Sequence, residues 1–129
     1  MAVNGKEIIT TENAPQAIGP YSVGVKCGSF VFTAGQIGLD PKSGTMVSGG
    51  VEFETRQALQ NLQNILESAG SSMRSVEKTT VYLSDMNNFA RMNSVYAEFF
   101  SENPPARSAV QAAALPKNAE VEIEAIALV

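Results

Sequence analysis

The sequence predicts an α+β protein in which a mixed β-sheet carries two helices on one face. Apolar residues recur at helical spacing in two separate segments, and segments rich in β-branched and aromatic residues lie before, between and after them. The chain of 129 residues is long enough for a hydrophobic core and contains no internal repeat or linker. We therefore expect a single domain over residues 1–129.

The two helices have readable boundaries. Between Phe53 and Ala69 the apolar residues follow helical spacing, and Gly70 is a natural stop. The second helix follows the sequence Asp85-Met86-Asn87-Asn88, where we expect an asparagine side chain to cap the first turn. Its apolar stripe ends before Pro104-Pro105, which cannot continue a helix. The stripe consists of Phe89, Met92, Tyr96, Phe99 and Phe100.

Four of the five strands that we expect can be assigned to particular segments of the sequence. Phe30–Leu39 begins as an apolar strand, and Thr79–Ser84 is β-branched and aromatic. Arg107–Ala114 is small and apolar, and Glu120–Val129 starts with strict alternation of glutamate and apolar residues. We expect the order strand, strand, helix, strand, helix, strand, strand, with the last two strands paired as a hairpin.

The second face of this sheet is also apolar in part. Phe30-Val31-Phe32 is apolar on both sides, and Ile126 and Leu128 lie on the side of the glutamates. Two helices cannot cover both faces, so the second face is predicted to be an association surface. We therefore expect a homo-oligomer, with a ligand site in a cleft between subunits.

The composition excludes several classes of function. The chain has no histidine, which excludes histidine-based acid–base catalysis and histidine-ligated metals. Its single cysteine, Cys27, cannot form an internal disulfide and is most simply a strand residue. The net charge of −4 argues against nucleic acid as the main partner. We find neither a targeting segment nor an apolar run of membrane-spanning length, and expect a cytoplasmic protein.

Arg107 and Glu122 are the charged residues that could carry chemistry. Arg107 could form an ion pair with a glutamate of the final strand, or it could bind a ligand carboxylate through two parallel hydrogen bonds. The pattern alone slightly favours the ion pair. Glu122 could hold and deprotonate a water molecule, but the flanking glutamates favour a solvated strand face.

Three further residues are weaker candidates. Asn93 lies beside the apolar stripe of the second helix, where a buried amide needs a partner. Tyr21 follows the Gly19-Pro20 turn, which would present its phenol at a loop tip, although the ring could also plug a sheet edge. Gly35 interrupts a strand pattern, which indicates a bulge or the close approach of a ligand.

Five motifs, in order along nearly the whole chain, resemble the Rid family, also called YjgF, and its RidA-type deaminases in particular. They are AIGPYS, FTAGQIGLDPKSG, KTTVYLSDMNNFARMNSVYAEFF, PPARSAVQAAALP and VEIEAIALV. The resemblance implies a chorismate-mutase-like fold and a homotrimer with sites in the clefts between subunits. It also implies hydrolysis, without metal or cofactor, of reactive imines and enamines such as 2-iminopropanoate, 2-iminobutanoate and 2-aminoacrylate.

The resemblance also assigns roles to the candidate residues. Arg107 is similar to the family arginine that binds the substrate carboxylate, and Glu122 to the glutamate that orients the hydrolytic water. Tyr21, Gly35 and Asn93 match further pocket positions. A sixth pocket position is often cysteine in the family but is Ala109 here, so only backbone contacts are expected from it.

Two other functions remain open. The same pocket could bind small carboxylic acids without converting them. Some relatives are described as ribonucleases or translation inhibitors. The net negative charge of this chain and its lack of histidine argue against such an activity here.

Overall fold

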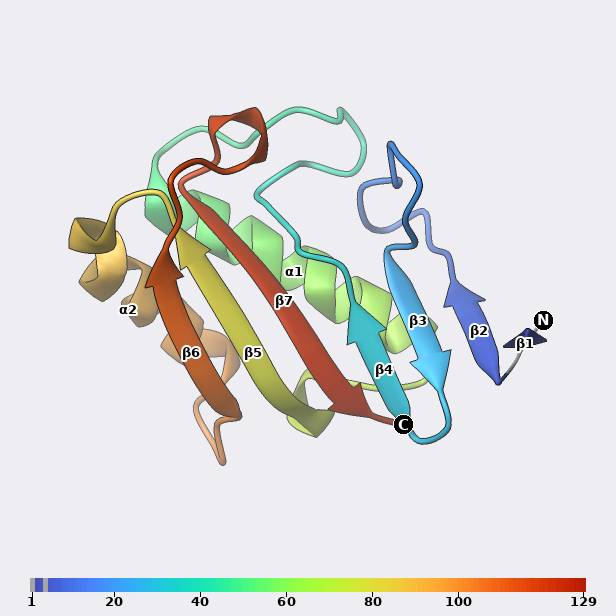
Figure 1. Ribbon diagram of the computed structural model, residues 1–129. Helices are drawn as coiled ribbons and strands as arrows, with labels where there is room; N and C mark the ends of the chain where they lie inside the picture. Colours follow the sequence, from blue (N-terminus) through green and yellow to red (C-terminus); the bar gives the residue numbers. More distant parts are fainter. Residues whose placement is uncertain (1, 4) are drawn as a thin grey trace.

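The structure is a computed structural model that describes residues 2–3 and 5–129. These residues form a seven-stranded sheet in the order β1-β2-β3-β4-β7-β5-β6, with α1 and α2 on the same face (Figure 1). The predicted α+β class is therefore confirmed. Met1 and Asn4 lie outside the described residues, so the single domain over residues 1–129 stays a prediction.

The element bounds in chain order are β1 (Ala2–Val3), β2 (Lys6–Ile9), β3 (Gly24–Cys27), β4 (Phe30–Thr33), α1 (Val51–Ser68), η1 (Met73–Ser75), β5 (Val76–Leu83), η2 (Met86–Asn88), α2 (Phe89–Phe99), β6 (Ala106–Gln111), η3 (Pro116–Asn118) and β7 (Val121–Leu128). The three η elements are single turns of 3₁₀-helix. Four strands therefore precede α1, where the sequence predicted two.

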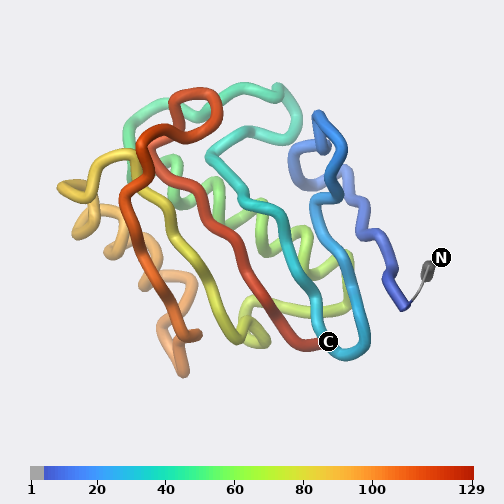
Figure 2. Tube along the Cα trace, viewed as in Figure 1, coloured from blue at the N-terminus to red at the C-terminus, as the bar shows by residue number. Residues whose placement is uncertain are grey.

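The last strand lies in the middle of the sheet. Figure 2 shows the red C-terminal trace between the cyan segment of β4 and the yellow segment of β5. The predicted hairpin between the last two strands is wrong, because β6 pairs with β5 in parallel and β7 pairs with β4 and β5 in antiparallel fashion. The reason is that α2 connects β5 to β6. A helical crossover of this kind lets the second strand run parallel to the first.

The ends of the helices are close to prediction, but one cap differs. α1 ends shortly before Gly70, which adopts a φ of 83°. In η2, before α2, the Asp85 carboxylate accepts a hydrogen bond from Asn87 N–H at 2.9 Å, whereas Asn88 makes no side-chain cap. The predicted asparagine cap is therefore wrong. An aspartate carboxylate is an equally good acceptor for the free N–H groups of a first turn.

The core lies between the sheet and the helices, and the opposite surface of the sheet, here called the open face, is uncovered in the single chain. On the core side, Val31 and Ile123 are completely buried. On the open face, Phe30 and Phe32 are 44% and 43% exposed, and their ring centroids lie 6.2 Å apart. Leu128 pairs with Phe30 in the register, which extends the apolar area onto β7. The predicted apolar second face is therefore present.

We expect Phe32→Glu to prevent self-association, because a carboxylate within the apolar part of the open face would oppose its burial. The molar mass in solution, measured by light scattering after size exclusion, should fall to that of one chain. Phe53→Glu is the matched control, because Phe53 is 55% exposed but lies on α1. Wild type and Phe32→Glu sharing one mass would contradict the prediction.

Candidate functional site

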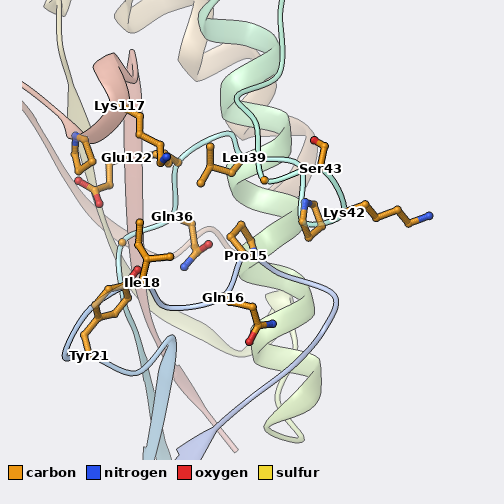
Figure 3. Close-up of a pocket in the computed structure, with 15 residues that line it drawn as sticks. Pro15, Gln16, Ile18, Tyr21, Gln36, Leu39, Lys42, Ser43, Lys117 and Glu122 are labelled. Atoms are coloured by element: carbon orange, nitrogen blue, oxygen red, sulfur yellow. The ribbon is translucent and has the colours of Figure 1, made fainter.

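A cavity of about 360 Å³ lies between β7 and three loops (Figure 3). Three residues of the predicted site, Tyr21, Gly35 and Glu122, line it together. Tyr21 is half exposed, and its N–H donates to the carbonyl oxygen of Gly19 at 2.8 Å, so the predicted turn does present this ring at a loop tip. The structure thus brings together one acidic, one phenolic and one backbone component.

Glu122 lies on the open face of β7. Its neighbours Val121 and Ile123 are completely buried against the helices, so alternation directs Glu122 to the other side. The side chain is half-buried, and burial raises the pKa of its carboxyl above the ordinary 4.5, with a smaller contribution from the charge of Glu124. A carboxyl with a raised pKa is better suited to accept and return a proton near neutral pH.

Gly35 lies against Glu122 because the loop after β4 continues alongside β7. Gln36 and Ile123 exchange two backbone hydrogen bonds, of 2.8 and 3.0 Å. This pairing places Gly35 so close that a Cβ atom there would lie 2.5 Å from Oε2 of Glu122. A side chain at position 35 would displace the Glu122 carboxylate, so the glycine leaves Glu122 in its place between its own strand and this loop.

Arg107 lies on β6, on the side of the sheet that carries the helices. Its Nη1 donates to Oδ1 of Asn93 at 2.7 Å, and its guanidinium carbon lies 5.3 Å from the ring centroid of Phe89 and 4.7 Å from that of Tyr96. Both aromatic contacts are cation–π interactions. Among the described residues no glutamate forms an ion pair with Arg107, so the ion-pair interpretation of the sequence is wrong.

The rings beside Arg107 are themselves fixed. The Tyr96 hydroxyl shares a hydrogen bond of 2.7 Å with the hydroxyl of Thr79, which is completely buried and lies directly opposite Arg107 in the β5–β6 register. Burial raises the pKa of Tyr96, so its phenol stays neutral. Ala109 follows on the same side of β6 and packs against the core. Neutral groups therefore hold Arg107 in place.

The candidate residues form two groups that do not meet within one chain. Arg107, Asn93 and Ala109 lie on the helix side of the sheet, whereas Glu122, which lines the cavity, lies on the open face of β7. In addition, β5 separates β6 from β7. Arg107 and Glu122 of one chain therefore cannot act on the same small molecule.

Sequence reasoning missed two features of the site. Helical spacing predicts that Phe89 and Tyr96 belong to an apolar stripe, but it does not predict that their rings stack on Arg107. Lys117 lines the cavity, and Figure 3 shows its side chain extending toward it, whereas Lys42 points away. Lys117 has a φ of 55°, a left-handed conformation that no sequence pattern here predicts.

The part of the chain that the structure describes contains neither a candidate metal cluster nor a helix that could span a membrane. Within residues 2–3 and 5–129, no group of three or more His, Cys, Asp or Glu side chains could hold a metal ion. No helix in this part of the chain is long and apolar enough to cross a bilayer.

We expect Glu122→Gln to raise the melting temperature near pH 7. Burial raises the pKa of Glu122 in the folded chain, so folding favours the protonated form, and this contribution to stability is lost as the pH rises through the folded pKa. Glutamine stays neutral and avoids this loss. The advantage should vanish below about pH 4.5, the ordinary pKa. Calorimetry of both proteins across pH checks this, and an advantage that grows toward acid would contradict it.

Comparisons with known proteins agree with this architecture. Residues 11–129 match the family model described as Endoribonuclease L-PSP. A RutC family protein of Pyrococcus horikoshii is 58% identical over 122 residues, which cover 95% of this chain and 97% of that protein. The human 2-iminobutanoate/2-iminopropanoate deaminase is 50% identical over 123 residues, which cover 95% of this chain and 90% of that protein.

A solved structure has the same fold at clear sequence identity. The crystal structure of E. coli TdcF with bound serine superposes with a TM-score of 0.91 at 45% identity, covering 95% of this chain and 98% of that chain. The family model, the relatives and the solved structure each match nearly the whole length of this chain, and they indicate the same family. The chain therefore belongs to the Rid (YjgF) family, described as Endoribonuclease L-PSP, and to its RidA type.

Proposed function

We propose that this protein is a deaminase that hydrolyses short 2-imino acids without a cofactor. The substrates are 2-iminopropanoate, its enamine tautomer 2-aminoacrylate, and 2-iminobutanoate, and the products are 2-oxo acids and ammonia. The observation that carries the proposal is an arginine held in place by neutral groups only, which leaves its charge available to a carboxylate. The human relative, at 50% identity, bears the name of this activity.

Each proposed site combines groups from two chains. Arg107 lies on β6, which is an edge strand, whereas Glu122 lies on the open face that we expect a second copy to cover. A homotrimer with one cleft at each subunit boundary would bring Arg107 of one chain to Glu122 of the next. Closed symmetry of this kind gives every chain the same two roles.

The proposed mechanism uses positioning and proton transfer. Nη1 of Arg107 is occupied by Asn93, and the remaining guanidinium donors bind the substrate carboxylate through parallel hydrogen bonds. Water adds across the C=N bond: its oxygen bonds to carbon, and its proton reaches the nitrogen through Glu122. Glu122 then takes the proton of the new hydroxyl and passes it to the amino group. The C–N bond breaks, ammonia leaves and the C=O bond forms.

We expect Arg107→Ala to lower kcat/KM about 100-fold or more, because a charged hydrogen-bonding partner of the substrate is lost. The assay follows the loss of freshly generated 2-iminopropanoate. Arg74→Ala, which removes an exposed arginine elsewhere, is the matched control and should behave as wild type. Near-normal turnover by a folded, oligomeric Arg107→Ala protein would contradict the proposal.

A mixing experiment tests whether two chains share each site. Arg107→Ala and Glu122→Gln proteins should each retain little activity. Co-refolding them in equal amounts should restore roughly one quarter of the wild-type sites, because random assembly pairs two intact groups that often. Native mass spectrometry verifies that mixed oligomers form. Mixed oligomers without any recovered activity would contradict a shared site.

Two alternatives have specific support. The TdcF structure with bound serine favours a module that binds small carboxylates without converting them. Binding of 2-oxobutanoate by a wild-type protein that hydrolyses no imine would support this alternative. The family description favours a ribonuclease, although a net charge of −4 weighs against it. RNA cleavage that is abolished by Arg107→Ala would support that activity.

A further inference from the structure

Glu54 is a buried acidic residue that lies outside the cavity. It lies on the first turn of α1 and is only 6% exposed. Its Oε1 accepts a hydrogen bond of 2.8 Å from the N–H of Glu120, the residue immediately before β7. Burial raises the pKa of Glu54, and the N–H bond partly opposes this. Burying a carboxyl group is costly, so a role beyond filling space is expected at this position.

Glu54 also contacts the loop that carries Gly35. A Cβ atom at Gly38 would lie 2.7 Å from Cα of Glu54 and 3.0 Å from its Cβ, so only a glycine allows this approach. Two turns further along α1, the completely buried Asn61 donates a hydrogen bond from Nδ2 to the carbonyl oxygen of Leu39 at 2.9 Å. The sheet-facing side of α1 therefore holds this loop at more than one point.

The start of β7 is fixed from two directions. Glu54 accepts the N–H of Glu120, and Ser84 N–H at the end of β5 donates to the carbonyl oxygen of Glu120 at 3.1 Å. Glu122 lies two residues further along, in β7. Its side chain is so close to Gly35 that a methyl group at position 35 would not fit between them. A small movement of either the loop or the strand would therefore change this contact.

We propose that Glu54 is a positioning residue for the deaminase reaction: by holding Glu120 and contacting Gly38, it sets the separation between Glu122 and the loop at Gly35. The inference rests on the proposed function. Glu54 does not line the cavity, so it acts through the backbone rather than on the substrate. Displacing a proton-transfer group by about 1 Å can cost on the order of 100-fold in rate.

The test compares Glu54→Leu with Glu54→Gln in the full-length oligomer. Glutamine retains an acceptor oxygen for Glu120 N–H, whereas leucine has similar size and no acceptor. For 2-iminopropanoate, Glu54→Leu should lower kcat about 10- to 100-fold with KM unchanged. Glu54→Gln should stay close to wild type. The affinity for 2-oxobutanoate, which Arg107 holds, should be the same in all three proteins.

A stability control separates positioning from general loosening. Ile65→Ala removes a completely buried side chain from the same helix, on the side that packs against β3 near Gly24. It should lower the melting temperature and leave kcat unchanged at a temperature where it is folded. If Glu54→Leu does not fold, Gly38→Ala replaces it, because a Cβ there would press on the backbone of Glu54 and should lower kcat alone.

The outcomes are distinguishable from failure of the proposed function. A wild-type protein without imine hydrolysis overturns the deaminase itself. A wild-type enzyme whose Glu54→Leu and Glu54→Gln variants have equal kcat overturns the role of Glu54 and leaves the deaminase standing. An equal loss of kcat in Ile65→Ala would also overturn it, because loosening the helix would then suffice.

Discussion

The alternation of side chains along β7 is the constraint on which the rest of the structure depends. This strand lies between β4 and β5, and its residues Val121, Ile123, Ala125 and Ala127 complete the core. A shift of one residue in register would expose all four and bury the glutamates between them. The side of the sheet on which Glu122 lies is therefore decided by core packing, before any requirement of chemistry applies.

The two halves of the proposed site are held by different means. Aromatic rings and an amide on α2 surround Arg107 on a regular strand, and the completely buried hydroxyl of Thr79 holds one of those rings. The cavity that contains Glu122 is instead bounded largely by loops, whose backbone is bonded to β7 and to buried polar groups of α1. The geometry of this second half of the site is thus fixed by hydrogen bonds that join the loops to the sheet and to α1.

The sequence predicts the long periodic elements well, because each contains several turns or a full alternation of its own. It fails for β2 and β3, which are four residues long and carry too little pattern. It also fails for the partner of β6, since strand pairing depends on how α2 crosses the sheet. Arg107 and Glu122 are identifiable as unusual charges. Their position on opposite faces of the sheet depends on the order of the strands, and local sequence patterns do not reveal this order.

The central position of β7 has a consequence for biosynthesis. Phe30 pairs with Leu128, so two strands that are far apart in the sequence close the middle of the sheet. Pairings of such sequence separation form late, because the intervening chain must first be brought together. During translation, the edge of β4 that pairs with β7 has no partner until β7 has been made. The nascent chain must therefore keep an aromatic strand edge from meeting other chains while the residues between β4 and β7 are made.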